Sequence, residues 1–290
     1  RMIHSIRRVC NVKSVVRNIT FDSKKVKCIS LDVTGTLLVH SQCVERTYAD
    51  CISWAGIPDV PAPLELSPPF KAAFKNASQR YPCYGHHNHM SSRDWWSCMA
   101  ADFVTRANIA MSPAEFDRFF TRLYQHFGCQ RGYEVLPDAA ALLRWVSEEA
   151  SAGRKKYYMG IITNTDFRTI DSILPVMGIH DHFDWFVCSR GVGVEKPGLP
   201  IFEEAHRRAQ LVHPGIRRDE ILHIGDNLVT DFYGAQAAGF QALFLDRRDN
   251  PRITGYQPWI IPPVFDNMTK EFVEENSVTS LEQVINLLKK

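Results

Sequence analysis

The sequence predicts an α/β protein with a doubly wound, mainly parallel sheet and a helical segment inserted after the first strand. Two observations favour this class. Short apolar runs that end at polar residues alternate with helix-like segments in the second half of the chain, and a long stretch without strand-like alternation follows the first run. The chain has 290 residues, of which 45% are hydrophobic and 23% charged, so it can bury a sizeable core.

The predicted strands are short and strongly apolar, and VKCISLD is the first of them. Their ranges are 26–32, 157–166, 184–189, 221–226 and 241–246. Helices are expected at 135–150, 167–178, 201–210 and 231–239. This alternation is typical of parallel strands joined by crossover helices that cover both faces of a sheet.

The stretch between the first two strands has helical periodicity instead. Helices are expected at 43–56, 70–80, 92–109 and 113–127, and a Pro-rich elbow at 58–69. Ser112 and Pro113 are suited to be the cap and first turn of the last helix. We therefore expect three parts: a basic N-terminal extension (1–25), an α/β core (26–40 and 132–290), and a helical lid (41–131).

Composition excludes several classes of partner. The formal net charge is only +2, from 34 basic and 32 acidic residues, so no strongly basic surface argues for nucleic acid. No apolar run approaches the ~18 residues of a membrane-spanning helix. We expect neither nucleic acid nor a membrane as a partner, and a monomer or a weak dimer.

Two features bear on the cellular compartment. The eight cysteines are scattered without a C-x-x-C pair, which favours reduced thiols and a cytoplasmic protein. Residues 1–20 carry five basic residues and no acid, however, and this pattern resembles a mitochondrial transit peptide. A mitochondrial protein is therefore the alternative, and a surface arm packed on the core is another interpretation of the same segment.

Polar residues end four of the predicted strands: Asp32, Thr163, Ser189 and Asp226. Because ligands of open α/β sheets bind beyond the carboxyl ends of the strands, these side chains should meet at one crevice. An aspartate at a strand end can also merely cap the next element. Asp231, however, brings a third carboxylate to the same place, and three carboxylates repel one another unless a cation holds them. Hard oxygen ligands of this kind suit Mg²⁺.

Four short motifs occur in order along residues 26–246. They are Asp32-x-Thr34-Gly35-Thr36, Thr163 followed by Asn164, Lys196-Pro197, and Gly225-Asp226-x4-Asp231. Together they resemble the four motifs of the haloacid dehalogenase superfamily. The resemblance implies a Rossmann-like core with a helical cap domain inserted between the first two motifs.

The resemblance also implies a role for each motif residue in phosphoryl transfer. Asp32 would be the nucleophile that forms an aspartyl-phosphate. Mg²⁺ would be held by Asp32, the backbone carbonyl of Thr34 and Asp226, with Asp231 as a further ligand or a support. The residues that would bind the phosphate and neutralise its charge are Thr163, Asn164 and Lys196.

Position 34 departs from the superfamily's phosphatases, which usually carry a second aspartate there as a general acid and base. Threonine cannot exchange a proton near neutral pH, and the loss could add ~3–5 kcal/mol to the barrier. Because the implied metal ligand at Thr34 is its backbone carbonyl, metal binding should survive. The expected function is a weak Mg²⁺-dependent phosphatase acting on a small phosphorylated metabolite.

Three precedents for the missing aspartate stay open. P-type ATPases resemble the chain locally and carry threonine there, but they have membrane segments. Dehalogenases of the superfamily also lack the second aspartate, but they need no metal, and the retained GDN-x3-D pattern argues against this activity. The third alternative is a catalytically impaired binding or regulatory protein.

Overall fold

The computed structural model describes residues 18–153, 156–250 and 269–290. Most of the predicted basic extension, up to residue 17, lies outside this range. The described residues form two compact units. Unit 1 comprises residues up to 39 together with 135–164 and 179–290, and unit 2 comprises 40–134 and 165–178. In the described ranges, no helix has both the length and the apolar character needed to cross a membrane.

Unit 1 is built on a parallel sheet, as the sequence predicts. Within the described ranges its strands are β1 (Cys28–Leu31), β4 (Tyr158–Thr163), β5 (Trp185–Cys188), β6 (Ile221–Gly225), β7 (Gln241–Leu245) and β8 (Ser277–Val278). They are ordered β5-β4-β1-β6-β7-β8, and every neighbouring pair is parallel. The central strand β1 is completely buried, because its apolar side chains face helices on both sides.

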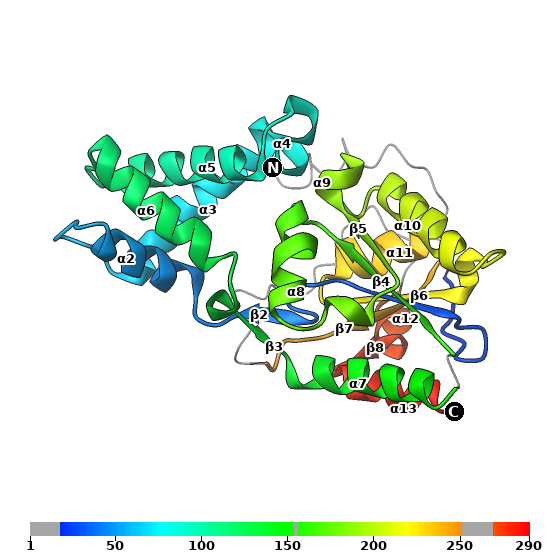
Figure 1. Ribbon diagram of the computed structural model, residues 1–290. Helices are drawn as coiled ribbons and strands as arrows, with labels where there is room; N and C mark the ends of the chain where they lie inside the picture. The colour runs from blue at the N-terminus through cyan, green and yellow to red at the C-terminus, as the bar shows by residue number, and fades with distance from the viewer. Residues whose placement is uncertain (1–17, 154–155, 251–268) are drawn as a thin grey trace. The chain divides into compact units, whose positions relative to one another are not determined.

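Helices cover both faces of this sheet (Figure 1). In the part of unit 1 that the structure describes, the α-helices are α7 (Pro137–Ser151), α9 (Ser189–Val192), α10 (Leu199–Val212), α11 (Gly234–Ala237), α12 (Lys270–Glu275) and α13 (Leu281–Leu288). Figure 1 shows α10 and α11 on one face, with α7 and α13 on the other. Ile201, Phe202 and Ala205 of α10 form part of the core cluster on their face, since this spacing puts them on one side of the helix.

Two predicted helices of the core are less regular than expected. The 231–239 prediction corresponds to a π-helical turn at Leu228–Tyr233 followed by α11. The 167–178 prediction corresponds to a π-helical turn at Thr169–Ile173 followed by α8 (Leu174–Val176). This second segment belongs to unit 2, whereas the predicted α/β core (26–40 and 132–290) includes it.

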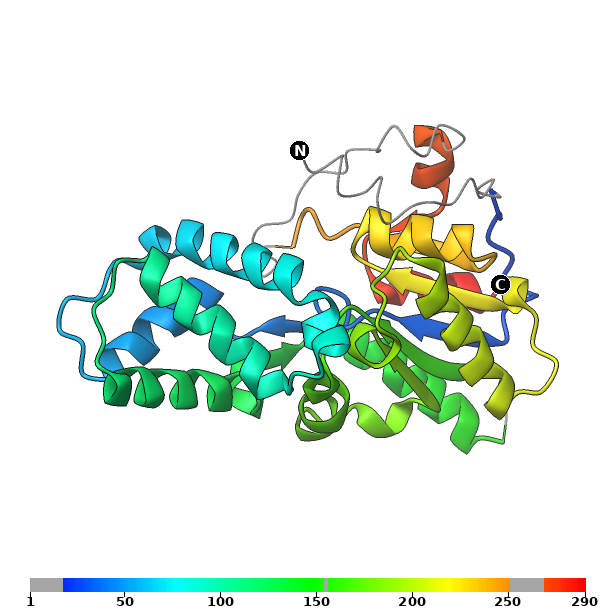
Figure 2. The same cartoon turned by 90° about the horizontal axis from the view of Figure 1, so that it is seen from above.

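Unit 2 is helical. In the described ranges it contains α2 (Val44–Trp54), α3 (Pro63–Arg80), α4 (Pro82–Gly85), α5 (Ser92–Arg106), α6 (Pro113–His126) and α8. Figure 2 shows α2, α3, α5 and α6 packed side by side, and their buried residues form one apolar cluster. The predicted cap of α6 is confirmed: Ser112 Oγ accepts from the Glu115 amide, and the Glu115 carboxylate accepts in return from the Ser112 amide. The chain leaves unit 1 along β2 (Leu38–His40) and returns along β3 (Tyr133–Val135), which form a two-stranded sheet.

The Pro-rich elbow predicted at 58–69 is wrong over its second half, because α3 already begins at Pro63. Proline is tolerated at a first helical position, since its missing N–H would have no partner there. Pro68 and Pro69 lie inside the helix and deprive the carbonyls of Leu64 and Glu65 of donors. Leu64 is 85% exposed, so this turn of the helix faces water. The packing of the buried face of α3 on α5 outweighs the local preference.

Candidate active site

The order of the strands brings the motif residues of unit 1 together. β4, β1 and β6 are neighbours, and Leu31 is in register with Ile161 on one side and Ile224 on the other. Asp32 directly follows β1 and Asp226 directly follows β6, while Thr163 is the last residue of β4. All three residues therefore lie at the carboxyl edge of the sheet, as the sequence predicts.

Lys196 joins two of the carboxylates. Its Nζ donates to Asp32 Oδ1 at 2.8 Å, to Asp231 Oδ1 at 2.5 Å and to the carbonyl oxygen of Ile162 at 2.6 Å. Its side chain is 1% exposed, so these three acceptors satisfy the three donors of a buried ammonium. The lysine belongs to the site and is not a surface residue.

Asn164 fixes the backbone of this lysine. Its Nδ2 donates to the Lys196 carbonyl at 2.9 Å, and its Oδ1 accepts from the Lys196 amide at 2.7 Å. The predicted contact of Asn164 with a phosphate stays a prediction. Directly after β4, the side chain of Asn164 thus holds the backbone of Lys196 in place through two hydrogen bonds.

The ionisation of the three groups follows from burial and from their mutual charges. Burial raises the pKa of Asp32 to about 6, although the charge of Lys196 opposes the shift. Burial disfavours the charged form of Lys196, but the charges of Asp231 and Asp32 outweigh it and raise the pKa of the lysine. Burial also acts to raise the pKa of Asp231, but Lys196 and His223 hold it below its usual value. The arrangement is a buried ion-pair network with Lys196 at its centre.

Asp226 lies against the turn that follows β1. A Cβ atom at Gly35 would lie 2.2 Å from Asp226 Oδ2, so this close approach requires glycine, as does the φ of +86° at this residue. Thr36 Oγ1 donates a long hydrogen bond of 3.5 Å to Asp226 Oδ1. Burial, followed by the charges of Asp32 and Asp231, raises the pKa of Asp226 well above its usual value. The carboxylate therefore needs a cation to be stable in its charged form.

A buried histidine that the sequence analysis did not identify supports Asp231. His223 Nε2 lies 3.3 Å from Asp231 Oδ1, and His223 Nδ1 lies 3.0 Å from Ser30 Oγ. Burial lowers the pKa of His223, so the ring is neutral. Because a carboxylate only accepts, Nε2 carries the proton and Nδ1 accepts from Ser30. The sequence offered one signal for this contact: Ser30 and His223 are polar residues inside the apolar strands CISL and ILHIG. In the structure they are in register.

The donor set of this edge fits a magnesium ion. Among the described residues, one oxygen each from Asp32, Asp226 and Asp231 lie within 4.8 Å of one another. Both oxygens of Asp231 already accept, one from Lys196 and His223 and the other from the Asn227 amide at 3.0 Å. Asp32 and Asp226 are therefore the better candidates for direct ligands, and hard oxygen donors of this kind suit Mg²⁺.

Thr34 is exposed and lies two residues after Asp32. Its backbone forms an isolated bridge with Leu38 across the turn. The structure thus brings together Asp32, Thr163, Lys196, Asp226 and Asp231, and Thr34 lies in the turn that follows Asp32. The roles of these residues in catalysis, substrate binding and metal binding stay predictions.

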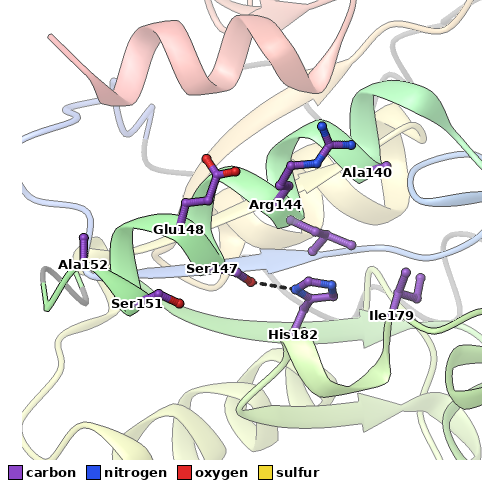
Figure 3. Close-up of a pocket in the computed structure, with 9 residues that line it drawn as sticks. Ala140, Arg144, Ser147, Glu148, Ser151, Ala152, Ile179 and His182 are labelled. Carbon is purple, nitrogen blue, oxygen red and sulfur yellow. Dashed lines mark hydrogen bonds between the residues drawn. The ribbon is translucent and has the colours of Figure 1, made fainter.

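A separate hollow of about 680 Å³ lies along α7 in unit 1 (Figure 3). Its lining residues are Ala140, Leu143, Arg144, Ser147, Glu148, Ser151, Ala152, Ile179 and His182. Figure 3 shows the hydrogen bond in which Ser147 Oγ and His182 Nδ1 lie 2.8 Å apart. Glu148 is the one carboxylate among these lining residues, so the hollow does not offer the carboxylate cluster found at the strand ends.

Comparison with known proteins identifies relatives along most of the chain. A family model described as haloacid dehalogenase-like hydrolase matches residues 26–239. The chain is 29% identical, over 227 residues, to haloacid dehalogenase-like hydrolase domain-containing protein 3 from Danio rerio; the match covers 78% of this chain and 88% of the relative.

Solved structures give the same fold. The 2-haloacid dehalogenase from Pseudomonas syringae superposes with a TM-score of 0.57 at 18% identity, over 91% of this chain and 98% of that one. A HAD-hydrolase from Bacillus subtilis, described as bound to magnesium, superposes with a TM-score of 0.53 at 17% identity, over 91% and 99% of the two chains. These likenesses establish the α/β fold that the sequence predicts.

Proposed function

The chain belongs to the haloacid dehalogenase-like hydrolase family, and we propose that within this family it is a weak Mg²⁺-dependent phosphatase that acts through Asp32 on small phosphate compounds. The observation that supports this function best is the carboxylate cluster of Asp32, Asp226 and Asp231. A cluster of buried and half-buried carboxylates with a raised pKa at Asp226 is suited to a divalent cation.

Asp32 is the proposed nucleophile because it is buried and accepts a hydrogen bond from the ammonium of Lys196. Its pKa of about 6 leaves the carboxylate mostly ionised near neutral pH. In the proposed reaction a carboxylate oxygen of Asp32 forms a bond to phosphorus while the bond from phosphorus to the ester oxygen breaks. Water then attacks the aspartyl-phosphate, which releases phosphate and restores Asp32.

Lys196 and Thr163 would stabilise the charge of the transferring group. Asp231 accepts from the Lys196 ammonium, and Asn164 holds the Lys196 backbone through two hydrogen bonds, so the ammonium is oriented before a substrate arrives. Thr163 contributes a hydrogen bond to Asp32 at the end of β4. Mg²⁺, held by Asp32, Asp226 and the Thr34 carbonyl, would supply positive charge beside the phosphate oxygens.

Thr34 limits the chemistry in both half-reactions. A leaving alkoxide needs a proton, and the attacking water must lose one, but a threonine hydroxyl supplies neither function near neutral pH. Substrates with good leaving groups, such as p-nitrophenyl phosphate or an acyl phosphate, avoid the first requirement. We therefore expect slow turnover with these compounds and slower turnover with alkyl phosphates.

Two alternatives belong to other classes. A binding or regulatory protein is favoured because position 34 is occupied by threonine and not by an aspartate. A metal-independent dehalogenase is suggested by structural neighbours such as the Pseudomonas syringae enzyme, but the carboxylate cluster counts against it.

The deciding assay compares wild type with Asp32→Asn on p-nitrophenyl phosphate and acetyl phosphate, with Mg²⁺ or with EDTA. We expect Mg²⁺-dependent release of phosphate by the wild type and none by the variant. Release of chloride from 2-chloropropionate in EDTA would overturn the proposal in favour of a dehalogenase. Mg²⁺ binding without turnover of any ester would favour the binding protein.

A further inference from the structure

Arg247 is a buried arginine that belongs to none of the four motifs. It follows β7 with one residue between, and its side chain is 4% exposed. Its Nε donates to the carbonyl of Gly35 at 3.3 Å and its Nη2 to the carbonyl of Thr36 at 3.0 Å. Nη1 and Nη2 also donate to the two oxygens of Asp138, at 2.6 and 3.2 Å. The guanidinium thus connects a carboxylate to two backbone carbonyls of the turn after β1.

The turn held by Arg247 is the one that follows Asp32. The amides of residues 36–38 all donate to the carbonyl of Val33, and the Gly35 amide donates to the carbonyl of Leu38. These internal bonds use the carbonyls of Val33 and Leu38, whereas Arg247 uses those of Gly35 and Thr36. The arginine therefore adds an external constraint to a turn that already has internal ones.

Asp138 fixes the position of the arginine from outside the turn. It is the second residue of α7, where a negative charge is favoured by the helix dipole. Its Oδ2 also accepts from the amide of Leu281, the first residue of α13, at 2.8 Å. The Arg247–Asp138 pair thus joins the end of β7 to the first turns of α7 and α13.

We propose that Arg247 is a positioning residue that sets the turn after Asp32, and with it the Thr34 carbonyl, for binding Mg²⁺. The proposal rests on the phosphatase function proposed above. Arg247 acts through the backbone of residues 34–36, since its described contacts are with carbonyls and with Asp138. Supporting residues outside the direct ligands typically change metal affinity or activity by about 10–100-fold when they are replaced.

The geometry requires arginine in particular. The planar guanidinium presents donors on two edges, so it can bind a carboxylate and two carbonyls at the same time. A lysine would keep the charge beside Asp138 but could not reach both carbonyls in this arrangement. Arg247→Lys therefore separates the charge of the side chain from its positioning of the turn.

The test measures Mg²⁺ affinity by calorimetry, kcat and KM with p-nitrophenyl phosphate, and amide hydrogen exchange of residues 34–38, all in the 290-residue chain. For Arg247→Lys we expect Mg²⁺ binding weakened about tenfold or more, a lower kcat and faster exchange at residues 36–38. The matched control is Arg248→Lys, because Arg248 is the next residue, is 51% exposed and pairs with Asp246. The control should change Mg²⁺ affinity by less than about twofold.

Asp138→Asn is the second variant and covers a failure of Arg247→Lys to fold. It keeps an acceptor for the arginine but removes the charge, so we expect a smaller change in the same direction. Unchanged Mg²⁺ affinity and unchanged exchange at 34–38 in the variants that fold, even with a lower melting temperature, would overturn the proposal. If the wild type neither binds Mg²⁺ nor hydrolyses an ester, the proposed function fails, and the exchange rates alone decide whether Arg247 positions the turn.

Discussion

Lys196 donates a 2.8 Å hydrogen bond to Asp32, although 164 positions separate the two residues in the sequence. The same ammonium donates to Asp231 and to the carbonyl of Ile162. Burial favours the neutral form of Asp32, and the lysine opposes it, which leaves a pKa of about 6. One buried cation thus keeps the proposed nucleophile ionised near neutral pH.

Replacing this cation should impair the proposed reaction. Lys196→Met removes the positive charge beside Asp32, so the carboxyl should become harder to ionise and the phosphoryl group less well stabilised. We expect the rate with p-nitrophenyl phosphate at saturating Mg²⁺ to fall about 10²-fold or more. Lys24→Met changes an exposed lysine and should leave the rate unchanged. A Lys196→Met rate within about threefold of wild type would contradict the assigned role.

The two aspartates of the last motif should differ in their effect on metal affinity. Asp226 Oδ1 accepts a long hydrogen bond from Thr36 Oγ1, whereas both oxygens of Asp231 accept from Lys196, His223 or a backbone amide. Asp226→Asn should therefore weaken Mg²⁺ binding by about tenfold or more. Asp231→Asn should weaken it less. Calorimetry on both variants measures the difference, with exposed Asp117→Asn as the control. Equal or reversed losses would contradict the assignment of Asp226 as the more direct ligand.

The strand ends were predictable because the signal is local. A short apolar run that ends at a polar residue identifies both a strand and the side chain at its carboxyl edge, as at Asp32 and Asp226. The alternation of these runs with helices then predicts a parallel sheet, but it does not give the order β5-β4-β1-β6-β7-β8 of the strands. The short strand β8 gave no such signal, since Ser277–Val278 is too brief to form a recognisable apolar run.

The supporting contacts of the site were not predictable, because each depends on pairing between distant segments. Ser30 and His223 are unremarkable in their own strands and meet only through the register of β1 and β6. Arg247 and Asp138 meet 109 positions apart, where three elements begin or end. The elbow prediction for the Pro-rich stretch was wrong for the same reason, since the tertiary packing of α3 decides the conformation of these residues.

Acid should destabilise the protein in part through His40, which ends β2. Its ring centroid lies 5.3 Å from that of Phe127 and 5.1 Å from that of Tyr133, and burial lowers its pKa below 6.5. As the pH falls through 6.5, the unfolded chain takes up a proton that the folded protein does not bind. Stability is therefore lost with falling pH, by at most about 1.4 kcal/mol per pH unit, until the folded pKa is reached.

His40→Phe keeps an aromatic ring in this packing and removes the titration. Urea unfolding at about pH 7.5 and pH 5 should show a smaller loss of stability in the variant than in the wild type. His126, whose pKa burial also lowers, should account for part of the remaining loss. His87→Phe changes an exposed histidine and serves as the control. An unchanged difference between the two pH values would exclude His40 as a source of the acid sensitivity.

Thr34 gives the sharpest prediction for turnover. It is exposed and lies two residues after Asp32, and its side chain cannot act as an acid or a base near neutral pH. Thr34→Asp places a carboxyl there, so hydrolysis of esters with poor leaving groups should rise by about 10²–10⁴-fold. The gain with p-nitrophenyl phosphate should be smaller, because p-nitrophenolate leaves without being protonated.

Steady-state kinetics on an alkyl phosphate and on p-nitrophenyl phosphate, in the background of Asp32 and of Asp32→Asn, separates the possible outcomes. A larger gain for the alkyl ester, which vanishes in the Asp32→Asn background, supports a proton-transfer defect at Thr34. An unchanged rate in Thr34→Asp, with activity still lost in Asp32→Asn, would mean that another group already supplies the acid. If neither the wild type nor Thr34→Asp hydrolyses any ester while Mg²⁺ still binds, the missing aspartate is not what limits the site, and the chain is a binding protein.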